Sequence, residues 1–445
     1  MRVHDLRSMF VVFLVSTAIS LTACEATTPT PRPTRSLSSI SIAPTVERTA
    51  TLEPTEEPIR VPIEPTEAPT FTPVPLGAAI PTAKPGSAQT SFSSSANDPL
   101  LPKFGAFPPK AIPSRPANLN PLTGLSIDPA VLKKRPLVAR IGNDQIVRTS
   151  VWHAGLNAAD LVFEELIDVI GNQYAHTRYS AVYLTNTPPL IGPIRSGRVI
   201  NFQMVPMLDG AFVFSGASNG TRWLFGQTPM INLDEYFNQP AYCYDKSHGY
   251  QGRLYTTGQR IREWLQQKGW EKSVPLYGFN FGDKPAGGQG VNSIALTRAP
   301  WPAWSTVEWK YDAGTGGYSR FTTGTPHMEA NKSVTAKWGN GADCVTNSAE
   351  TRQQVRATNV VVLWARHEKT QISEDSNNAV SVYINLTGQG DAQFFRDGVA
   401  IKGKWKRASE QEFFEFTDTA GNKYSLKPGT TWFEIVPLGY VVDTK

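Results

Sequence analysis

The sequence is poor in the residues that usually hold metal ions. Only three cysteines and six histidines occur in 445 residues. Neither Cys-x-x-Cys nor His-Glu-x-x-His spacing is present, although structural zinc sites and metalloprotease sites rely on such spacing. We therefore expect no metal centre and no cofactor.

Charge is also sparse. Charged residues make up 18% of the chain, against about 25% in an average globular domain, and the formal net charge is only +5. A nucleic-acid-binding protein usually concentrates basic residues on one face. The composition gives no sign of such a face, and we expect no nucleic acid as a partner.

Long apolar runs are absent except at the start of the chain. Met9–Ala23 is apolar, follows the basic residues Arg2 and Arg7, and is too short to span a bilayer comfortably. The run ends in "LTAC", which resembles a bacterial lipobox. This pattern predicts a signal peptide over 1–23 and lipidation of Cys24, which would anchor the protein to the cell membrane facing outside the cytoplasm.

The next segment, residues 24–116, has the composition of a disordered tether. Nineteen of the 35 prolines lie in residues 25–116, together with many threonines and serines, and this stretch contains neither tryptophan nor tyrosine. Such a segment cannot bury enough apolar surface to offset the entropy lost on ordering. We therefore predict a disordered Pro/Thr/Ser-rich tether that holds a folded head away from the membrane.

The remaining residues predict an α+β head in two domains: a mixed α/β domain over 117–289 and a mainly β domain over 290–445. In the first domain, hydrophobic patterns predict strands at Leu137–Ile141, Leu161–Ile170, Arg178–Leu184 and Ala211–Ser215, and helices at Val199–Leu208 and Gln259–Lys268. In the second, they predict strands at Val360–Trp364, Ala379–Leu386, Phe413–Thr417, Tyr424–Leu426 and Thr431–Val436.

Several motifs in the head resemble a known family. "NPLTG", "ADLVFEELID", "TRYSAVYL", "IGPIRSGR" and "FSGAS" resemble the N-terminal domain of YerB-like bacterial lipoproteins, and "NVVVLW", "GQGDAQFFRDGVAIKGKWKR" and "GNKYSLKPGTTWFEIVP" resemble the C-terminal domain of that family. The resemblance implies a tethered lipoprotein with two family domains, and it carries no established catalytic activity. One departure is Gln251-Gly252-Arg253, where the family tends to have Pro-His-Asn.

The motif "IGPIRSGR" concentrates positive charge where an extended segment meets an expected helix. Arg195, Ser196 and Arg198, joined by Arg178, could present guanidinium groups and backbone N–H groups to an anion. The same arginines could instead form ion pairs that hold the fold together. The acidic candidates for that second role are Asp160, Glu164 and Asp168. Both interpretations remain open from the sequence, and catalytic use of the arginines is a third.

A separate motif raises the possibility of an enzyme. "GASNG" fits the Gly-x-Ser-x-Gly pattern of a nucleophile elbow, with Ser218 as the nucleophile and with Asp245 and His248 following in the order that a triad needs. Against this, the head does not show the alternating strands and helices of an α/β-hydrolase. An envelope hydrolase using Ser218 is therefore an alternative function.

The last two cysteines, Cys243 and Cys344, could form one disulfide in an oxidising compartment, or could remain as two buried thiols. Seven of the eleven tryptophans lie in residues 301–432. We expect most of them in a β core, with Trp301 and Trp304 exposed among prolines. Exposed aromatics would favour a protein-binding adhesion or scaffold module.

The interpretation that these features favour is a non-catalytic envelope protein. It would bind an anionic ligand, such as a cell-wall polymer or another envelope component, through Arg195, Ser196 and Arg198.

Overall fold

The computed structural model describes residues 114–445, except residues 152, 168–175, 348 and 375–378. The signal peptide, Cys24 and nearly all of the tether lie outside these residues, and so does Asp168. Just before the predicted head, the guanidinium of Arg115 donates to the carbonyl oxygen of Phe279 at 3.2 Å. Within the described part of the chain, no helix is long and apolar enough to cross a membrane.

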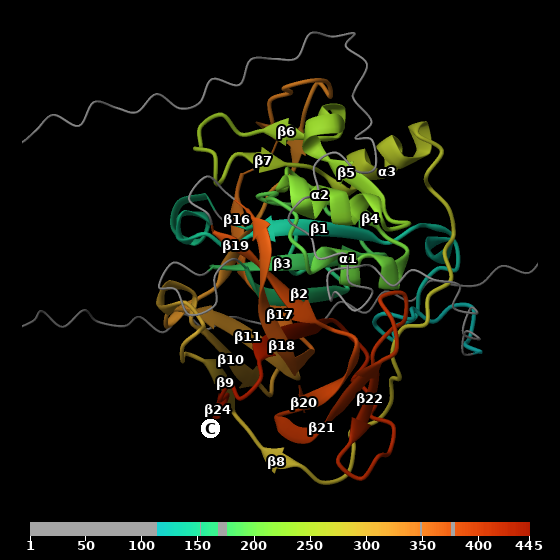
Figure 1. The fold of residues 1–445 in the computed structure, drawn as a ribbon, viewed down its shortest axis with the longest axis vertical. Helices are drawn as coiled ribbons and strands as arrows, with labels where there is room; N and C mark the ends of the chain where they lie inside the picture. The colour runs from blue at the N-terminus through green and yellow to red at the C-terminus, as the bar shows by residue number, and fades with distance from the viewer. Residues whose placement is uncertain (1–113, 152, 168–175, 348, 375–378) are drawn as a thin grey trace, which may run out of the picture. The chain divides into compact units, whose positions relative to one another are not determined.

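One sheet of twelve strands forms the centre of the fold. Its strands are β1 Leu137–Gly142, β2 Leu161–Ile167, β3 His176–Tyr183, β4 Ala211–Phe214, β5 Ile231–Asp234, β8 Gln289–Gly290, β18 Asn359–Ser373, β19 Val380–Asn385, β20 Gly388–Arg396, β21 Val399–Arg407, β22 Glu415–Asp418 and β23 Thr431–Pro437. The order along the sheet is β22-β21-β20-β18-β23-β2-β3-β1-β4-β5, with β19 paired to β18 and β8 to β21. In Figure 1, β4 and β5 lie towards one end of the view and β20–β22 towards the other.

The middle of this sheet is buried on both faces. Strands β1, β4 and β5 run parallel to one another, as do β2, β23 and β18, and the antiparallel β3 joins the two groups. Along β2 the apolar side chains alternate, so that Phe163 belongs to one hydrophobic cluster and Val162 and Leu166 to another. Strands whose side chains are buried on both faces are typical of sheets covered on both sides.

Three α-helices occur in the described residues: α1 Asn201–Met204, α2 Asn219–Gly226 and α3 Gly258–Gln267. Helix α3 begins after Thr257, whose side chain accepts from the N–H of Arg260, and ends before Gly269, which has a φ of 68°. Helix α1 is much shorter than the predicted Val199–Leu208 helix. Because Pro206 has no N–H to donate, the chain continues as a 3₁₀ turn, Pro206–Leu208.

Smaller sheets complete the fold. Six strands, β9 Ser293–Leu296, β10 Val307–Asp312, β11 Gly317–Thr322, β12 Thr325–Pro326, β17 Arg356–Ala357 and β24 Asp443–Thr444, form a second sheet. Three strand pairs stand apart: β6 Cys243–Tyr244 with β7 Leu254–Tyr255, β13 Met328–Asn331 with β16 Thr351–Gln354, and β14 Val334–Thr335 with β15 Val345–Thr346. The predicted strand Tyr424–Leu426 makes only an isolated bridge, from Leu426 to Phe281.

The two sequence regions separated at residue 289/290 share the central sheet. Strand β23, near the end of the chain, lies between β2 and β18 in parallel register with both. The described residues are mostly strands, and their α-helices all precede residue 290. The mixed and β-rich regions are therefore neighbours within one sheet.

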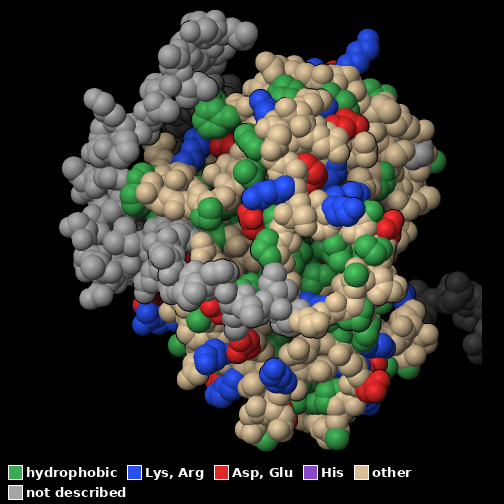
Figure 2. Space-filling view, turned by 90° about the vertical axis from the view of Figure 1, so that its right-hand side faces the viewer, with side chains coloured by type: hydrophobic (Ala, Val, Ile, Leu, Met, Phe, Trp, Pro, Cys, Tyr) green, Lys and Arg blue, Asp and Glu red, His purple; other side chains and the backbone are tan. Residues whose placement is uncertain are grey.

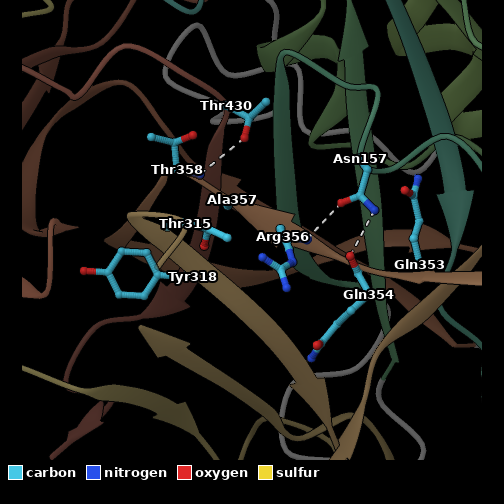
Figure 3. A pocket seen from close by; sticks show the side chains of 10 residues that line it. Asn157, Thr315, Tyr318, Gln353, Gln354, Arg356, Ala357, Thr358 and Thr430 are labelled. Atoms are coloured by element: carbon cyan, nitrogen blue, oxygen red, sulfur yellow. Dashed lines mark hydrogen bonds between the residues drawn. The ribbon is translucent and has the colours of Figure 1, made fainter. Parts of the chain in front are cut away.

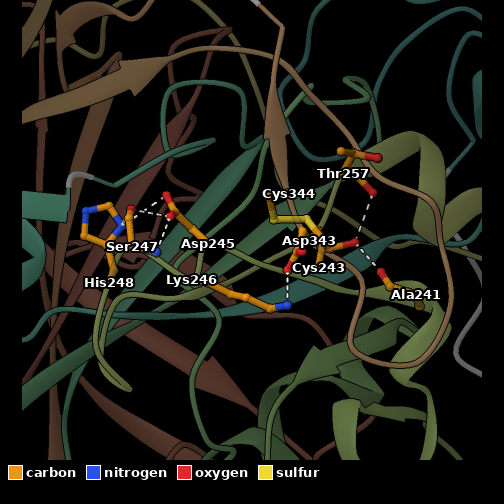
Figure 4. Close-up of a disulfide and its surroundings, with 10 residues drawn as sticks. Ala241, Cys243, Asp245, Lys246, Ser247, His248, Thr257, Asp343 and Cys344 are labelled. Carbon is orange, nitrogen blue, oxygen red and sulfur yellow. Dashed lines mark hydrogen bonds and ion pairs between the residues drawn. A yellow bond between two sulfur atoms is a disulfide. The ribbon is translucent and has the colours of Figure 1, made fainter.

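Cys243 and Cys344 form a disulfide between segments 101 residues apart, with their Cα atoms 5.1 Å apart (Figure 4). Cys243 lies in β6, and the Cys344 N–H donates to the carbonyl oxygen of Tyr244 at 3.0 Å. The disulfide thus ties the 342–344 segment to β6.

The tryptophans lie mainly in the core. Trp309, Trp405 and Trp432 are fully buried. The expectation that Trp301 is exposed was wrong: it is 3% exposed, and its indole N–H donates to the carbonyl oxygen of Ser305. Trp304 is half-buried. These positions give little support to an aromatic docking face on the second region.

Candidate functional site at the arginine corner

The motif Ile191–Arg198, here called the arginine corner, is an extended segment between the ends of three strands. The N–H of Arg195 donates to the carbonyl oxygen of Arg140 in β1, and its own carbonyl oxygen accepts from Ser215 just after β4. Ile194 donates to the carbonyl oxygen of Leu254 in β7. These backbone bonds place the arginine corner at the carboxyl ends of the parallel strands β1 and β4, the edge at which open α/β sheets bind ligands.

Close packing explains the glycine inside the motif. A Cβ atom at Gly197 would lie 2.7 Å from the ring of Phe225 and 3.1 Å from that of Phe212. Any side chain here would collide with aromatic rings beside β4 and α2. Gly197 therefore lets the backbone approach the sheet. This close approach fixes the positions of Arg195 and Arg198, which flank Gly197 in the sequence.

Arg195 is 9% exposed and is held on two sides. Its Nε lies 3.3 Å from a carboxylate oxygen of Asp144, just after β1. The ring of Tyr250 covers its guanidinium, with 4.8 Å between the guanidinium carbon and the ring centroid. Arg195 therefore supports an exposed tyrosine from beneath while it neutralises Asp144.

Arg198 and Arg178 also have partners within the fold. The Nη1 of Arg198 lies 3.7 Å from the carboxylate of Glu374 and donates to the carbonyl oxygen of Gly197. The same carboxylate accepts from the hydroxyl of Thr221 in the first turn of α2, at 2.8 Å. Arg178 donates to the carbonyl oxygen of Ser196 at 2.9 Å. The carboxylate of Glu374 thus lies against the first turn of α2, beside Arg198.

Two of the acids proposed as partners of these arginines lie elsewhere. The carboxylate of Asp160 accepts from the N–H groups of Leu184 and Thr185 and from the amide of Asn120, so it holds loops together. Glu164 pairs with Arg320, which comes from β11. The prediction of acidic partners from nearby sequence therefore missed Asp144 and Glu374, because folding brings together segments that are distant in the chain.

A buried charged cluster, defined by Glu164, Arg320 and Glu434, joins β2 and β23 to β11. Arg320 is fully buried, and its guanidinium faces the rings of Trp432, Tyr179 and Trp309 at 5.0, 5.5 and 5.7 Å. Glu434 lies opposite Glu164 in the register of β23 and β2 and accepts from the indole N–H of Trp309.

Burial, reinforced by the Glu164 carboxylate, raises the pKa of Glu434 well above its usual value. A protonated Glu434 leaves one carboxylate, that of Glu164, to balance the guanidinium of Arg320. The buried charged cluster can therefore be close to neutral.

Two histidines adjoin this cluster. The Nε2 of His327 lies 2.8 Å from the Nδ1 of His153, and the Nε2 of His153 lies 2.7 Å from the carbonyl oxygen of Gly142. Burial lowers the pKa of His153 to about 3 and lowers the pKa of His327 well below its usual value. Both rings are therefore neutral at physiological pH. The described residues contain no group of three or more histidine, cysteine or acidic side chains arranged to hold a metal ion.

A set of arginine and aromatic side chains, most of them exposed, adjoins the arginine corner. We call this set the arginine–tyrosine surface: Arg222, Arg253, Tyr236, Phe237 and Tyr250. Tyr250, Tyr236 and Phe237 are 65%, 57% and 54% exposed. The guanidinium of Arg222 packs near Tyr236, at 5.8 Å, and pairs with Asp234.

Tyr244 connects Arg253 with the part of this surface that contains Tyr236. The guanidinium of Arg253 lies 5.7 Å from the ring centroids of both Tyr244 and Tyr250. The hydroxyl of Tyr244 donates to Glu235, beside Tyr236. Arg253 is exposed and has no acidic partner within the described residues. Its guanidinium can therefore accept an anion from solution.

The catalytic candidates do not come together as a triad. Ser218 caps α2: its hydroxyl accepts from the N–H of Thr221 and bonds the hydroxyl of that residue at 3.1 Å. His248 lies 3.0 Å from Asp245 and 3.2 Å from the hydroxyl of Ser247 (Figure 4). Because the hydrogen bonds of Ser218 and His248 go to different partners, the expected Ser218–His248 contact is not formed in the described part of the chain.

Sequence reasoning missed the arginine–tyrosine surface. One available signal was the stretch Gln251-Gly252-Arg253, which departs from the Pro-His-Asn expected from the resemblance. Arg222 and Tyr236 gave no motif at all. Their proximity depends on the parallel pairing of β4 and β5, which sets the loops after those strands side by side.

Comparisons with known proteins all point to the same family. The models for the N-terminal and C-terminal domains of the proteins of unknown function DUF3048 match residues 122–271 and 297–433, together more than half of the chain. The chain is 25% identical over 340 residues to "Putative lipoprotein YerB" of Bacillus subtilis (strain 168), covering 74% of this chain and 89% of that protein.

The fold resembles the crystal structure of the YerB protein from Bacillus subtilis. The TM-score is 0.56 at 20% sequence identity, and the likeness covers 74% of this chain and 99% of that one. The two domain matches follow the order expected from the sequence motifs. The chain therefore belongs to the DUF3048 family.

Proposed function

We propose that this protein is an envelope lipoprotein, anchored to the membrane through lipidated Cys24, and that it binds an anionic polymer such as a cell-wall polymer. The apolar run ending in "LTAC" and the lipoprotein name of the Bacillus relative support the anchor. Acyl chains contribute about 0.8 kcal/mol for each buried methylene, so several chains would hold the protein firmly.

The observation that carries the binding proposal is the environment of Arg253. This exposed guanidinium lies beside the rings of Tyr244 and Tyr250, and no acid in the described residues pairs with it. An arginine matches the geometry of phosphate or carboxylate groups, while neighbouring tyrosine rings offer flat faces to sugars. Arg195 then acts as a positioning residue, because it supports Tyr250 from beneath.

The charge pattern favours a polymer with widely spaced negative groups. Arg195 and Arg222 are already paired with Asp144 and Asp234, which leaves Arg253 as the cation offered by this surface. On the face shown in Figure 2, basic and acidic side chains are interspersed. A dense polyanion such as nucleic acid usually needs a continuous basic face.

Purified teichuronic acid, a wall glycan with one carboxylate for each disaccharide, tests the binding with the full-length protein. We expect salt-sensitive binding to the wild type, and binding weakened about tenfold or more in Arg253→Ala. The matched control is Arg366→Ala, which removes another exposed arginine, one paired with Glu368, and should bind normally. Equal binding by Arg253→Ala and the wild type would rule the site out.

The anchor has its own test. Mass spectrometry of the native N-terminus should find an acylated cysteine at position 24, and Cys24→Ala should release the protein from membranes. An unmodified Met1 at the N-terminus would contradict the anchor.

A further inference from the structure

Two hollows adjoin one another, and none of the residues that line them belongs to the arginine–tyrosine surface. One has a volume of 470 Å³ and the other of 310 Å³, and both are lined by Asn157 and Gln353. We call the two together the amide groove. Each hollow falls within the range of about 300–1,000 Å³ that is usual for ligand sites. Figure 3 shows the side chains around the larger hollow.

Uncharged polar side chains are numerous in the lining of the amide groove, alongside apolar ones. Five amide side chains contribute: Asn157, Asn186, Asn331, Gln353 and Gln354. Three threonines add hydroxyls to the larger hollow. Each amide carries both donors and an acceptor, and each hydroxyl can do either. A lining of this kind can bond a ligand that is rich in hydroxyl and amide groups.

The charged groups along the amide groove already have partners. Lys332 lies 3.5 Å from Glu350, and Arg356 lies 3.3 Å from Asp312. The buried carboxylate of Glu329 accepts from the N–H of Leu156 and from the side-chain amide of Gln353. The amide groove therefore presents little net charge, unlike the surface around Arg253.

The floor of the amide groove is held in place. The side-chain amide of Asn157 donates to the carbonyl oxygen of Gln354, and its oxygen accepts from the N–H of Arg356, at 3.1 and 2.8 Å (Figure 3). These two bonds fasten the 155–158 loop to the β16–β17 strand segment. Because the site is formed before any ligand arrives, binding costs little ordering entropy.

Other groups in the amide groove remain available. The side-chain amide of Asn331 has no hydrogen-bond partner in the described residues, and this residue is exposed. Gln353 uses its N–H group on Glu329, which leaves its oxygen to accept a further bond. Asn331 and Gln353 both line the smaller hollow.

We infer that the amide groove binds a neutral glycan chain bearing hydroxyl and acetamido groups. The two adjoining hollows would hold successive sugar units, with Asn331 and Gln353 bonding their polar substituents. The site is independent of Arg253, and its failure would leave the proposed anionic site intact.

The soluble neutral tetrasaccharide tetra-N-acetylchitotetraose is the probe, titrated into the full-length protein by calorimetry. We expect saturable binding by the wild type. The affinity should be at least about tenfold lower in the Asn331→Ala, Gln353→Ala double variant, because it loses two hydrogen-bonding groups. Gln267→Ala, at the end of α3, removes an exposed amide outside the groove and should bind as the wild type does. Arg253→Ala should also bind the tetrasaccharide normally.

Two results would overturn the inference. One is the absence of saturable binding by the wild type up to about 10 mM tetrasaccharide. The other is unchanged affinity in the double variant, including the case in which Arg253→Ala alone loses the tetrasaccharide. A thermal melt of each variant, matching that of the wild type, ensures that a loss of affinity reports on the groove.

Discussion

Arg320 and Arg253 occupy opposite environments in one protein. Arg320 is fully buried, paired with Glu164 and faced by three aromatic rings. Arg253 is exposed, lies beside two tyrosines, and has no acidic partner in the described residues. Both arginines approach aromatic rings, so the rings alone do not distinguish a structural arginine from one that can bind a ligand.

The difference lies in water and in opposite charge. A buried guanidinium must find a carboxylate, because the cost of removing an unpaired charge from water is several kcal/mol. An exposed guanidinium meets no such requirement and remains available to an anion. Arg195 lies between these cases, since it is nearly buried and paired with Asp144 but still supports the exposed ring of Tyr250.

The largest effect is expected in the interior. Arg320→Met would leave the buried Glu164 without its partner and should lower the free energy of unfolding by about 3–5 kcal/mol. Urea unfolding followed by fluorescence measures this loss. Adding Glu164→Gln to the same chain should recover part of it, and that double variant also serves if Arg320→Met alone does not fold. A loss below about 1 kcal/mol would place Arg320 with the exposed arginines.

The next effect concerns the support of the arginine–tyrosine surface. Removing the disulfide in a Cys243→Ser, Cys344→Ser double variant should cost about 2–4 kcal/mol, because the bridge spans a separation of 101 residues and restricts the unfolded chain. The urea midpoint should fall, and a reductant should lower the midpoint of the wild type similarly. If neither the double variant nor the reductant changes the urea midpoint, the disulfide does not stabilise the fold.

Arg195 should show an intermediate effect. In Arg195→Ala the buried carboxylate of Asp144 loses its partner, which should cost about 1–3 kcal/mol. Arg195→Lys keeps the charge and should lose less. Calorimetric melting measures both variants. If Arg195→Ala has the same melting temperature as the wild type, Arg195 resembles Arg253 as a solvent-facing cation.

The smallest effect is a pH dependence of the interior. The folded pKa of His153 is about 3, below the usual value of about 6.5, so the unfolded chain binds a proton that the folded chain does not. Stability from this residue is complete above pH 6.5 and is lost as the pH falls towards 3. At pH 5.5 the loss should be about 1.4 kcal/mol.

Urea unfolding at several pH values measures this loss. His153→Asn should remove the contribution of His153 to this loss, so that the free energy of unfolding changes less between pH 7.5 and 5.5 than in the wild type. Identical pH profiles would show that His153 is protonated as easily in the folded chain as in the unfolded one.

Local pattern predicted much of the secondary structure. The apolar stretch Leu161–Ile170 predicted a strand, and β2 forms there over Leu161–Ile167. The helix before Gly269 was also predicted within a residue at each end. Such features depend on side-chain periodicity and end signals, which neighbouring residues carry themselves.

The partners of the arginines could not be predicted in this way. Glu374 reaches Arg198 across 176 positions of sequence, and Arg320 reaches Glu164 across 156. Nothing near Arg195 marked Asp144 as its partner instead of Asp160. These pairs form because strands from distant parts of the chain enter one sheet, an outcome that local periodicity does not specify.

The sequence by itself determined the apolar start, the proline-rich segment, the strand periodicity and the family motifs, because each is written in adjacent residues. Tertiary structure alone decided which arginines are neutralised inside and which face solvent. The reason is physical: whether a guanidinium needs a partner depends on the water around it, and that is set only when β2, β11 and β23 pack together.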